Sequence, residues 1–206
     1  MSRTSLKNMD SWITDPIQLS RLDDLVVFTQ RTSFIKSIMN LQSSETVISA
    51  AIERSCERRG IPCKFPRGKA AHILNYKDLS IERRYACSVM LKALYNTDDA
   101  GLDAGSDGTL VGGELLDRML FVFTRYVHQS KLAPSEVPLS FEHFAFLRQQ
   151  YALAELEFVG CDNCGSEYIS GRHLQGLRCP ICAAHKHAIR LKNQEPIIQQ
   201  SLRRSA

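Results

Sequence analysis

Residues 161–182 read CDNCGSEYISGRHLQGLRCPIC and contain four of the chain's seven cysteines. Cys161 and Cys164 form one CxxC pair, Cys179 and Cys182 form a second, and fourteen residues separate the pairs. A CxxC pair folds into a knuckle whose two thiolates point at one metal ion, and two knuckles complete the tetrahedron that zinc takes with four sulfurs. The stretch therefore predicts a C-terminal zinc ribbon in which four cysteines hold one structural Zn2+.

The residues between the pairs suit such a ribbon. Gly165 follows the first knuckle, where a positive φ is often needed. Residues 166–170 are typical of a short strand, and Leu177 is expected to begin the return strand after a turn bracketed by Gly171 and Gly176.

Two other chemistries use CxxC pairs. Iron–sulfur clusters usually show other cysteine spacings. A redox-active pair normally opens a helix in a thioredoxin-like fold, of which the sequence gives no sign. Four cysteine ligands also leave no open position for water, so hydrolysis at this metal is not expected.

The remaining metal-binding residue types have simpler interpretations. His173, His185 and His187 lie near the cluster and are expected at the surface. Cys56 and Cys87 fall on or beside apolar stripes and are expected in the core, as is common for free cysteines. Cys63 lies in a basic loop, where a reactive thiol is the less favoured alternative.

Upstream of the ribbon, helical periodicity predicts a mainly α fold over residues 20–159. We expect helices at 20–40 with Ser20 as N-cap, at 44–59 between Ser44 and Gly60, after Ser80, over about 112–127, and at 140–158 with Ser140 as N-cap. No strand is expected before residue 160. Residues 1–19 are expected to be a flexible extension, 160–192 the ribbon and a basic stretch, and 193–206 a tail. The apolar positions expected to face inward on the last three helices are Ile81, Tyr85, Met90, Leu91, Leu94, Leu115, Leu116, Met119, Leu120, Phe123, Val127, Phe141, Phe144, Leu147, Tyr151, Ala154 and Phe158.

Charge is unevenly distributed along the chain. The formal net charge is +4, but residues 51–84 carry nine basic and four acidic side chains, and residues 160–206 carry seven and three. Residues 85–159 carry five basic and ten acidic side chains. Basic segments attract nucleic acid or anionic surfaces. The helix expected at 44–59, which follows the helix at 20–40 after a short turn, also resembles the second half of a helix-turn-helix in outline.

Several functions are disfavoured by what the sequence lacks. No apolar run approaches the roughly 18 residues of a membrane helix, and the polar stretch 1–12 does not predict a secretory signal, so a cytoplasmic location is expected. Nucleotide-binding glycine loops, HExxH and GxSxG motifs do not occur. The chain is therefore not expected to be an enzyme.

Three stretches together resemble the FlhC family, the zinc-binding subunit of the bacterial flagellar master transcription activator. They are the loop GIPCKFPRG at 60–68, the segment from Tyr85 to Tyr95, and LEFVGCDNCGSEYI at 156–169 with CPIC at 179–182. The likeness covers most of residues 20–195, and its most specific part is the CxxCGxxYI stretch.

This resemblance implies a non-enzymatic subunit that works with a smaller helical partner, FlhD, in a ring-like hetero-oligomer. Such a complex binds double-stranded DNA upstream of promoters and recruits RNA polymerase. The family's structural zinc maps onto Cys161, Cys164, Cys179 and Cys182. The first 20 residues, the acidic segment 96–113 and the spacer between the knuckles depart from the flagellar members. They suggest a divergent relative, of the kind that activates conjugative-transfer genes of mobile elements.

Phosphate contacts require several Lys or Arg side chains, which set affinity and its salt dependence. The predicted DNA face comprises Arg54, Arg58, Arg59, Lys64, Arg67 and Lys69, with help from Lys186, Arg190 and Lys192. The alternative is an adaptor without direct DNA contact, in which the helices at 112–127 and 140–158 dock a partner protein.

Overall fold

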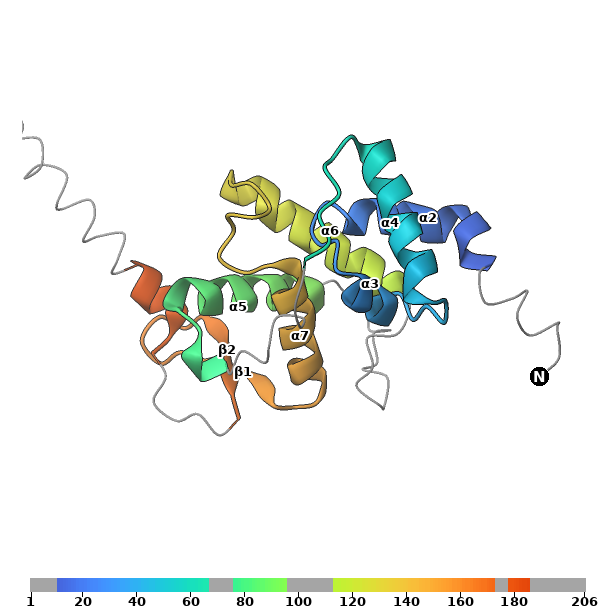
Figure 1. The fold of residues 1–206 in the computed structure, drawn as a ribbon. Helices are drawn as coiled ribbons and strands as arrows, with labels where there is room; N and C mark the ends of the chain where they lie inside the picture. The colour runs from blue at the N-terminus through green and yellow to red at the C-terminus, as the bar shows by residue number, and fades with distance from the viewer. Residues whose placement is uncertain (1–10, 67–75, 96–112, 173–177, 186–206) are drawn as a thin grey trace, which may run out of the picture.

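The structure is a computed structural model that describes residues 11–66, 76–95, 113–172 and 178–185 (Figure 1). The described part is mainly helical, as the periodicity predicted, with one two-stranded antiparallel sheet near its C-terminal end. The elements are η1 (Ser11–Thr14), α2 (Pro16–Leu25), α3 (Thr32–Ile38), α4 (Glu45–Arg59), η2 (Tyr76–Asp78), α5 (Ile81–Tyr95), α6 (Gly113–Ser130), α7 (Phe141–Ala152), β1 (Leu156–Gly160) and β2 (Glu167–Gly171).

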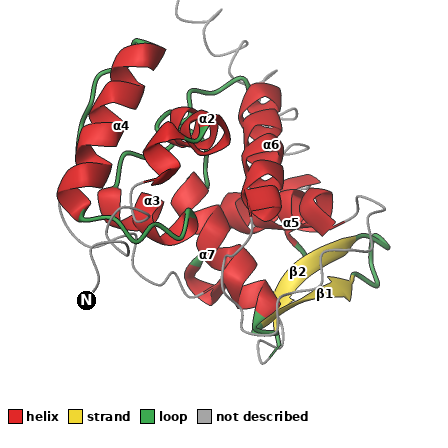
Figure 2. Cartoon of the chain, turned by 90° about the vertical axis from the view of Figure 1, so that its right-hand side faces the viewer, coloured by secondary structure: helices red, strands yellow, loops and turns green. Residues whose placement is uncertain are grey.

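Helices α2, α3 and α4 enclose the smaller of two hydrophobic cores (Figure 2). The predicted single helix at 20–40 is wrong: residues 26–31 interrupt it and leave α2 and α3 as separate helices. Helix α2 also begins at Pro16 rather than after Ser20, because the Asp15 carboxylate accepts the Ile17 N–H and caps the helix. Trp12 is buried, and its indole N–H donates to Ser43 Oγ at 2.8 Å. Residues 11–19 therefore belong to the helical domain and not to the predicted flexible extension.

The ends of α4 follow the prediction. The Ser44 hydroxyl accepts the Val47 N–H at the N-terminus. Gly60 has a φ of +64° at the C-terminus, and the N–H groups of Gly60 and Ile61 bond to the carbonyls of Glu57 and Cys56. This pattern is a Schellman motif, in which a left-handed residue closes the last turn.

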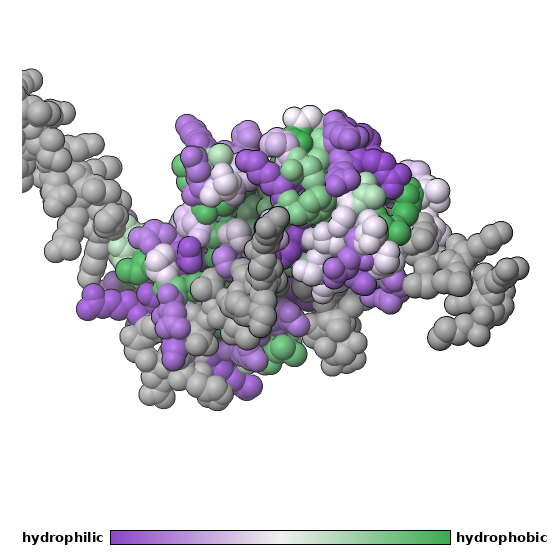
Figure 3. All heavy atoms as spheres, viewed as in Figure 1, coloured by the Kyte–Doolittle hydropathy of each residue, from purple (hydrophilic) through white to green (hydrophobic). Residues whose placement is uncertain are grey.

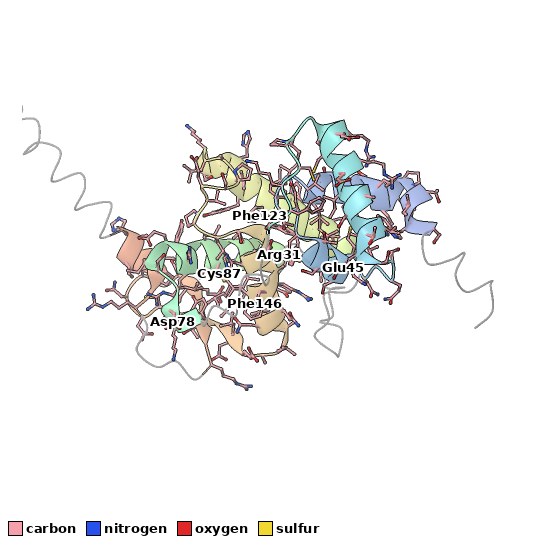
Figure 4. All side chains as sticks on the ribbon, viewed as in Figure 1. Arg31, Glu45, Asp78, Cys87, Phe123 and Phe146 are labelled. Atoms are coloured by element: carbon pink, nitrogen blue, oxygen red, sulfur yellow. The ribbon has the colours of Figure 1, made fainter. Side chains whose placement is uncertain are left out.

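Helices α5, α6 and α7 build the larger core around a set of aromatic rings. Phe123 packs edge-on against Phe28 and Phe141, with centroid separations of 5.0 and 5.3 Å, and is stacked with Phe144 at 6.3 Å. Phe123 and Cys87 lie in the interior (Figure 4). Most positions predicted to face inward on these helices are buried, and Val127 and Tyr151 are partly so. Ile81 and Tyr85 are exposed instead, because the buried face of α5 runs through Ala86, Cys87 and their helical neighbours.

Ion pairs and a hydrogen bond connect the helices of the two cores. Arg31, just before α3, forms an ion pair with Glu142 of α7 at 3.2 Å, and the Thr29 hydroxyl donates to the same carboxylate at 2.6 Å. Arg21 of α2 pairs with Asp117 of α6 at 2.7 Å. These contacts fix α2 and α3 against the helices that carry the larger core.

The predicted fifth helix ends six residues early, and its expected last turns form a strand instead. Ala154 takes a left-handed conformation with φ +56°, and the N–H groups of Ala154 and Glu155 bond to the carbonyls of Tyr151 and Gln150. This is a second Schellman motif, with alanine where glycine is usual. Ala154 is therefore exposed rather than inward, and Phe158 lies on β1.

Strands β1 and β2 form an antiparallel hairpin, with Leu156 opposite Gly171 and Gly160 opposite Glu167. Leu156 and Ile169 are buried in the larger core. Ser88 of α5 accepts the Ile169 N–H at 3.0 Å, and the Tyr76 hydroxyl donates to the Ile169 carbonyl. The hairpin is thus built into the helical domain. None of the described helices has the length and apolarity needed to cross a membrane.

Candidate metal centre and basic surface

The first cysteine pair occupies the turn of the β1–β2 hairpin. The Cys161 N–H bonds to the Ser166 carbonyl at 3.0 Å, and the Gly165 N–H bonds to the Cys161 carbonyl at 2.8 Å. Gly165 has a φ of +69°, which confirms the conformation predicted for it. The tight turn places the side chains of Cys161 and Cys164 on the same side of the knuckle, where a single ion can reach both sulfurs.

The second pair comes from a different local structure. Residues 180–185 are helical, and the Ala183 N–H bonds to the Cys179 carbonyl at 3.1 Å. Cys179 is only 7% exposed, whereas Cys182 is half-buried. The return strand expected from Leu177 begins outside the described residues.

The four sulfurs converge. They all lie within 4.8 Å of one another, with Cys161 and Cys182 Sγ separated by 3.7 Å and Cys164 and Cys179 Sγ by 3.9 Å. With zinc–sulfur bonds near 2.3 Å, a regular tetrahedron has sulfur–sulfur edges of about 3.8 Å. The separations therefore fit one tetrahedral ion such as zinc. A disulfide needs about 2.05 Å, so neither pair is bonded.

Hydrogen bonds and burial make the four thiols unequal. The backbone N–H of Ser166 donates to Cys164 Sγ and lowers the pKa of that thiol to about 6. Burial raises the pKa of the Cys179 thiol to about 12. The Asn163 side-chain amide donates to Cys182 Sγ at 3.2 Å. Since zinc binds thiolates, ion binding releases protons, including the proton that burial retains on the Cys179 thiol.

The other cysteines and histidines do not join the cluster in the described part of the chain. Cys56 and Cys87 are buried in the two cores as predicted, and burial raises the pKa of both thiols, that of Cys56 to about 11. Cys63 and His185 are exposed. His173 and His187 lie outside the described residues.

Four of the nine predicted DNA-binding residues are described, and they gather at the C-terminal end of α4. Arg58 pairs with Asp23 at 2.6 Å and Arg59 pairs with Asp24, both aspartates on α2. Arg54 donates to the carbonyl of Ala50 in its own helix. Hydrophilic side chains cover this end of α4 and the adjoining α2 (Figure 3).

The ion pairs of Arg58 and Arg59 make the surface at the end of α4 less basic than the sequence predicted. The two aspartates of α2 offset Arg58 and Arg59, and both ion pairs join helices of the smaller core. Lys64 lies in the loop after α4, which Gln30 holds by donating to the Pro62 carbonyl at 3.0 Å and accepting the Lys64 N–H. Lys64 is exposed. The remaining predicted DNA-binding residues, which lie outside the described part, are Arg67, Lys69, Lys186, Arg190 and Lys192.

The basic end of α4 and the cysteine hairpin lie on opposite sides of the molecule (Figures 1 and 2).

Comparison of the chain with models of known protein families gave no match, and comparison with curated proteins gave none either.

Gly165 and Gly60 offer a matched test of the knuckle. Both have positive φ, and an added Cβ would meet no atom within 4 Å at either site, so Gly→Ala costs only backbone strain, about 1–2 kcal/mol. We expect both variants to lose similar stability in urea unfolding, while only Gly165→Ala weakens zinc binding in a chelator competition. Equal zinc affinities in the two variants would contradict the role given to the knuckle turn.

Proposed function

We propose that this chain is an FlhC-like subunit of a hetero-oligomeric transcription activator. In this proposal it binds double-stranded DNA upstream of promoters together with an FlhD-like partner, recruits RNA polymerase, and activates flagellar or conjugative-transfer operons. The observation that carries the proposal is that residues 156–169, the stretch most similar to the FlhC family, fold as one continuous unit. They form a strand, a knuckle and a second strand whose Ile169 is buried in the helical core.

The metal has a structural role in this proposal. A zinc ion bound by the four thiolates would cross-link the hairpin turn to residues 179–182 and would carry a local charge of about −2. The basic residues that follow the cluster in the sequence offset this charge. They also keep the C-terminal segment compatible with a DNA backbone.

Within the predicted DNA face, the ion pairs favour some residues over others. Arg58 and Arg59 already have carboxylate partners, so a phosphate would have to compete with Asp23 and Asp24. We assign the phosphate contacts of this region to Lys64, Arg67 and Lys69 in the loop after α4, and assign Arg58 and Arg59 to the α2–α4 contact.

The test starts with a genome-wide map of DNA crosslinked to the protein in its own cells, with the partner expressed. Sharp peaks just upstream of promoters are expected, and the genes beside them distinguish flagellar from conjugative regulation. Absence of enrichment over an untagged strain would overturn the proposal.

Duplexes recovered from these peaks allow a residue-level prediction. Lys64→Ala, Arg67→Ala and Lys69→Ala combined should weaken binding and reduce the slope of log K against log salt by about 0.9 for each lost phosphate contact. The control, Arg58→Ala with Arg59→Ala, removes two charges and should leave the slope unchanged while lowering thermal stability slightly. The reverse pattern would assign the DNA contact to the end of α4.

The same ion pairs favour one alternative, a partner-binding adaptor without direct DNA contact. If Asp23 and Asp24 satisfy Arg58 and Arg59, this surface serves to hold α2 and α4 together rather than to attract a polyanion. An adaptor would show no salt-dependent retention of DNA by the purified complex, whereas the proposed subunit would retain it at low salt.

A further inference from the structure

A groove of about 410 Å3 runs between α5 and α6, which lie side by side on the part of the molecule away from α4 (Figure 2). Its floor is apolar and belongs to the larger core, since Met90, Leu94 and Val122 are all at least nine-tenths buried. Its rim includes Val89, which is 38% exposed, and Phe121, which is 65% exposed. The groove is therefore a hydrophobic surface continuous with the core.

The exposed apolar residues form a pattern. On α5, Tyr85, Val89 and Ala93 follow one another at four-residue spacing, so they share one face of the helix, and all three are exposed. Phe121 borders the groove from α6. Burying such an aromatic side chain is favourable, and the chain by itself leaves Phe121 exposed to solvent. Contiguous exposed apolar surface of this kind marks interaction sites.

The charge at the groove has one sign. The two charged residues that line it are Arg118 and Arg125, and no Asp or Glu is among its lining residues. The arginines are seven residues apart on α6, hence on the same face and about 10 Å apart along the helix. Arg125 is exposed, and a carboxylate on a facing helix would form charge-assisted hydrogen bonds with it.

We propose that the groove between α5 and α6 binds an amphipathic helix of a different protein, with an apolar stripe at i, i+3, i+4 and i+7 and acidic residues along one edge of that stripe. Helix-in-groove recognition uses anchors at such spacings. A second copy of this chain fits less well, because a two-fold contact would bring the arginines of both copies together. The chain's own residues 186–206 are strongly basic and would be repelled. The inference rests only on the part of the proposed function that gives the chain a protein partner.

The probe is a fluorescein-labelled 18-residue synthetic helix with leucines at i, i+3, i+4, i+7 and i+11 and glutamates seven residues apart along one edge of that stripe. It is titrated against the full zinc-loaded chain by fluorescence anisotropy. We expect saturable binding that weakens about tenfold or more for Phe121→Ser and for Arg125→Glu. A peptide with lysines in place of the two glutamates should bind Arg125→Glu better than it binds the wild type.

The matched control is Ile17→Ser, since Ile17 is 61% exposed on α2 and does not line the groove. It should bind the peptide like the wild type, and all variants should keep the zinc content and far-UV circular dichroism of the wild type. Binding that survives both groove substitutions, or that Ile17→Ser weakens equally, would overturn the proposal.

Two further outcomes would overturn the choice of occupant. A dimer in light scattering that Phe121→Ser dissociates would assign the groove to a second copy. Peptide affinity that rises when the four aspartates of residues 96–112 become asparagine would assign it to the chain's own acidic segment. DNA retention is measured separately on the same variants, so a failure of DNA binding leaves the groove result intact.

Discussion

Cys179→Ser is expected to leave the purified chain without stoichiometric zinc, and the wild-type chain is expected to carry one ion. Cys179 is the most buried of the four thiols, and its sulfur lies 3.9 Å from that of Cys164. Replacing even a hydrogen-bond partner of a metal ligand costs about 10–100-fold in affinity, and loss of a ligand itself costs more. Zinc is measured by mass spectrometry after gel filtration in metal-free buffer.

The same variant tests whether the helices stay folded when the metal site is lost. The four-cysteine site closes a short C-terminal segment, while the two cores are built from α2 to α7 and the hairpin. Helical circular dichroism should therefore persist in Cys179→Ser, and protease cleavage should move to residues beyond 171, after the hairpin. Cys63→Ser is the control, because Cys63 is exposed and outside the cluster. One zinc ion retained by Cys179→Ser would contradict the assignment of the four ligands.

The cysteine spacing alone predicted which four residues form the candidate metal site, because each CxxC pair places two thiols within one short turn. The helix caps at Ser44, Gly60 and Ser140 and the turn at Gly165 could likewise be predicted, since each depends on one side chain or one positive φ.

Two local signals were present but weak. Asp15 before Pro16 is a regular helix start, and its omission moved the boundary of α2. Ala154 closes α7 in a conformation that alanine adopts at a cost, so nothing in its identity marked the end of the helix. Residues 156–160 then continued an apolar helical pattern although they pair with β2, because short apolar runs fit both periods.

Long-range contacts explain the remaining features that could not be predicted from the sequence. Asp23 and Asp24 neutralise Arg58 and Arg59 across 35 residues of sequence, and no local pattern predicts which charges will meet. The Tyr76 and Ser88 hydroxyls that hold the backbone of Ile169 are separated from it by 93 and 81 residues. They were missed for the same reason, and they decide how the hairpin joins the helices.

Ile169→Ala is expected to destabilise the whole chain, by about 2–5 kcal/mol in urea unfolding. The Ile169 side chain is fully buried in the core shared by α5, α6 and α7. Truncation leaves a cavity between the hairpin and α5 rather than a gap inside the hairpin alone. The matched control is Ile17→Ala, the same substitution at a side chain that is 61% exposed, which should change stability by no more than about 0.5 kcal/mol.

The contrast between Ile169→Ala and Cys179→Ser tests how the metal centre depends on the helices. If the backbone contacts of Ile169 make hairpin and helices one cooperative unit, Ile169→Ala lowers a single unfolding transition seen by both helical circular dichroism and zinc release. If the hairpin opens independently, zinc release shifts to lower urea while the helical transition stays in place. Since Ser88 and Tyr76 bond both backbone groups of Ile169, we expect the single transition, and separated transitions in the wild type would contradict it.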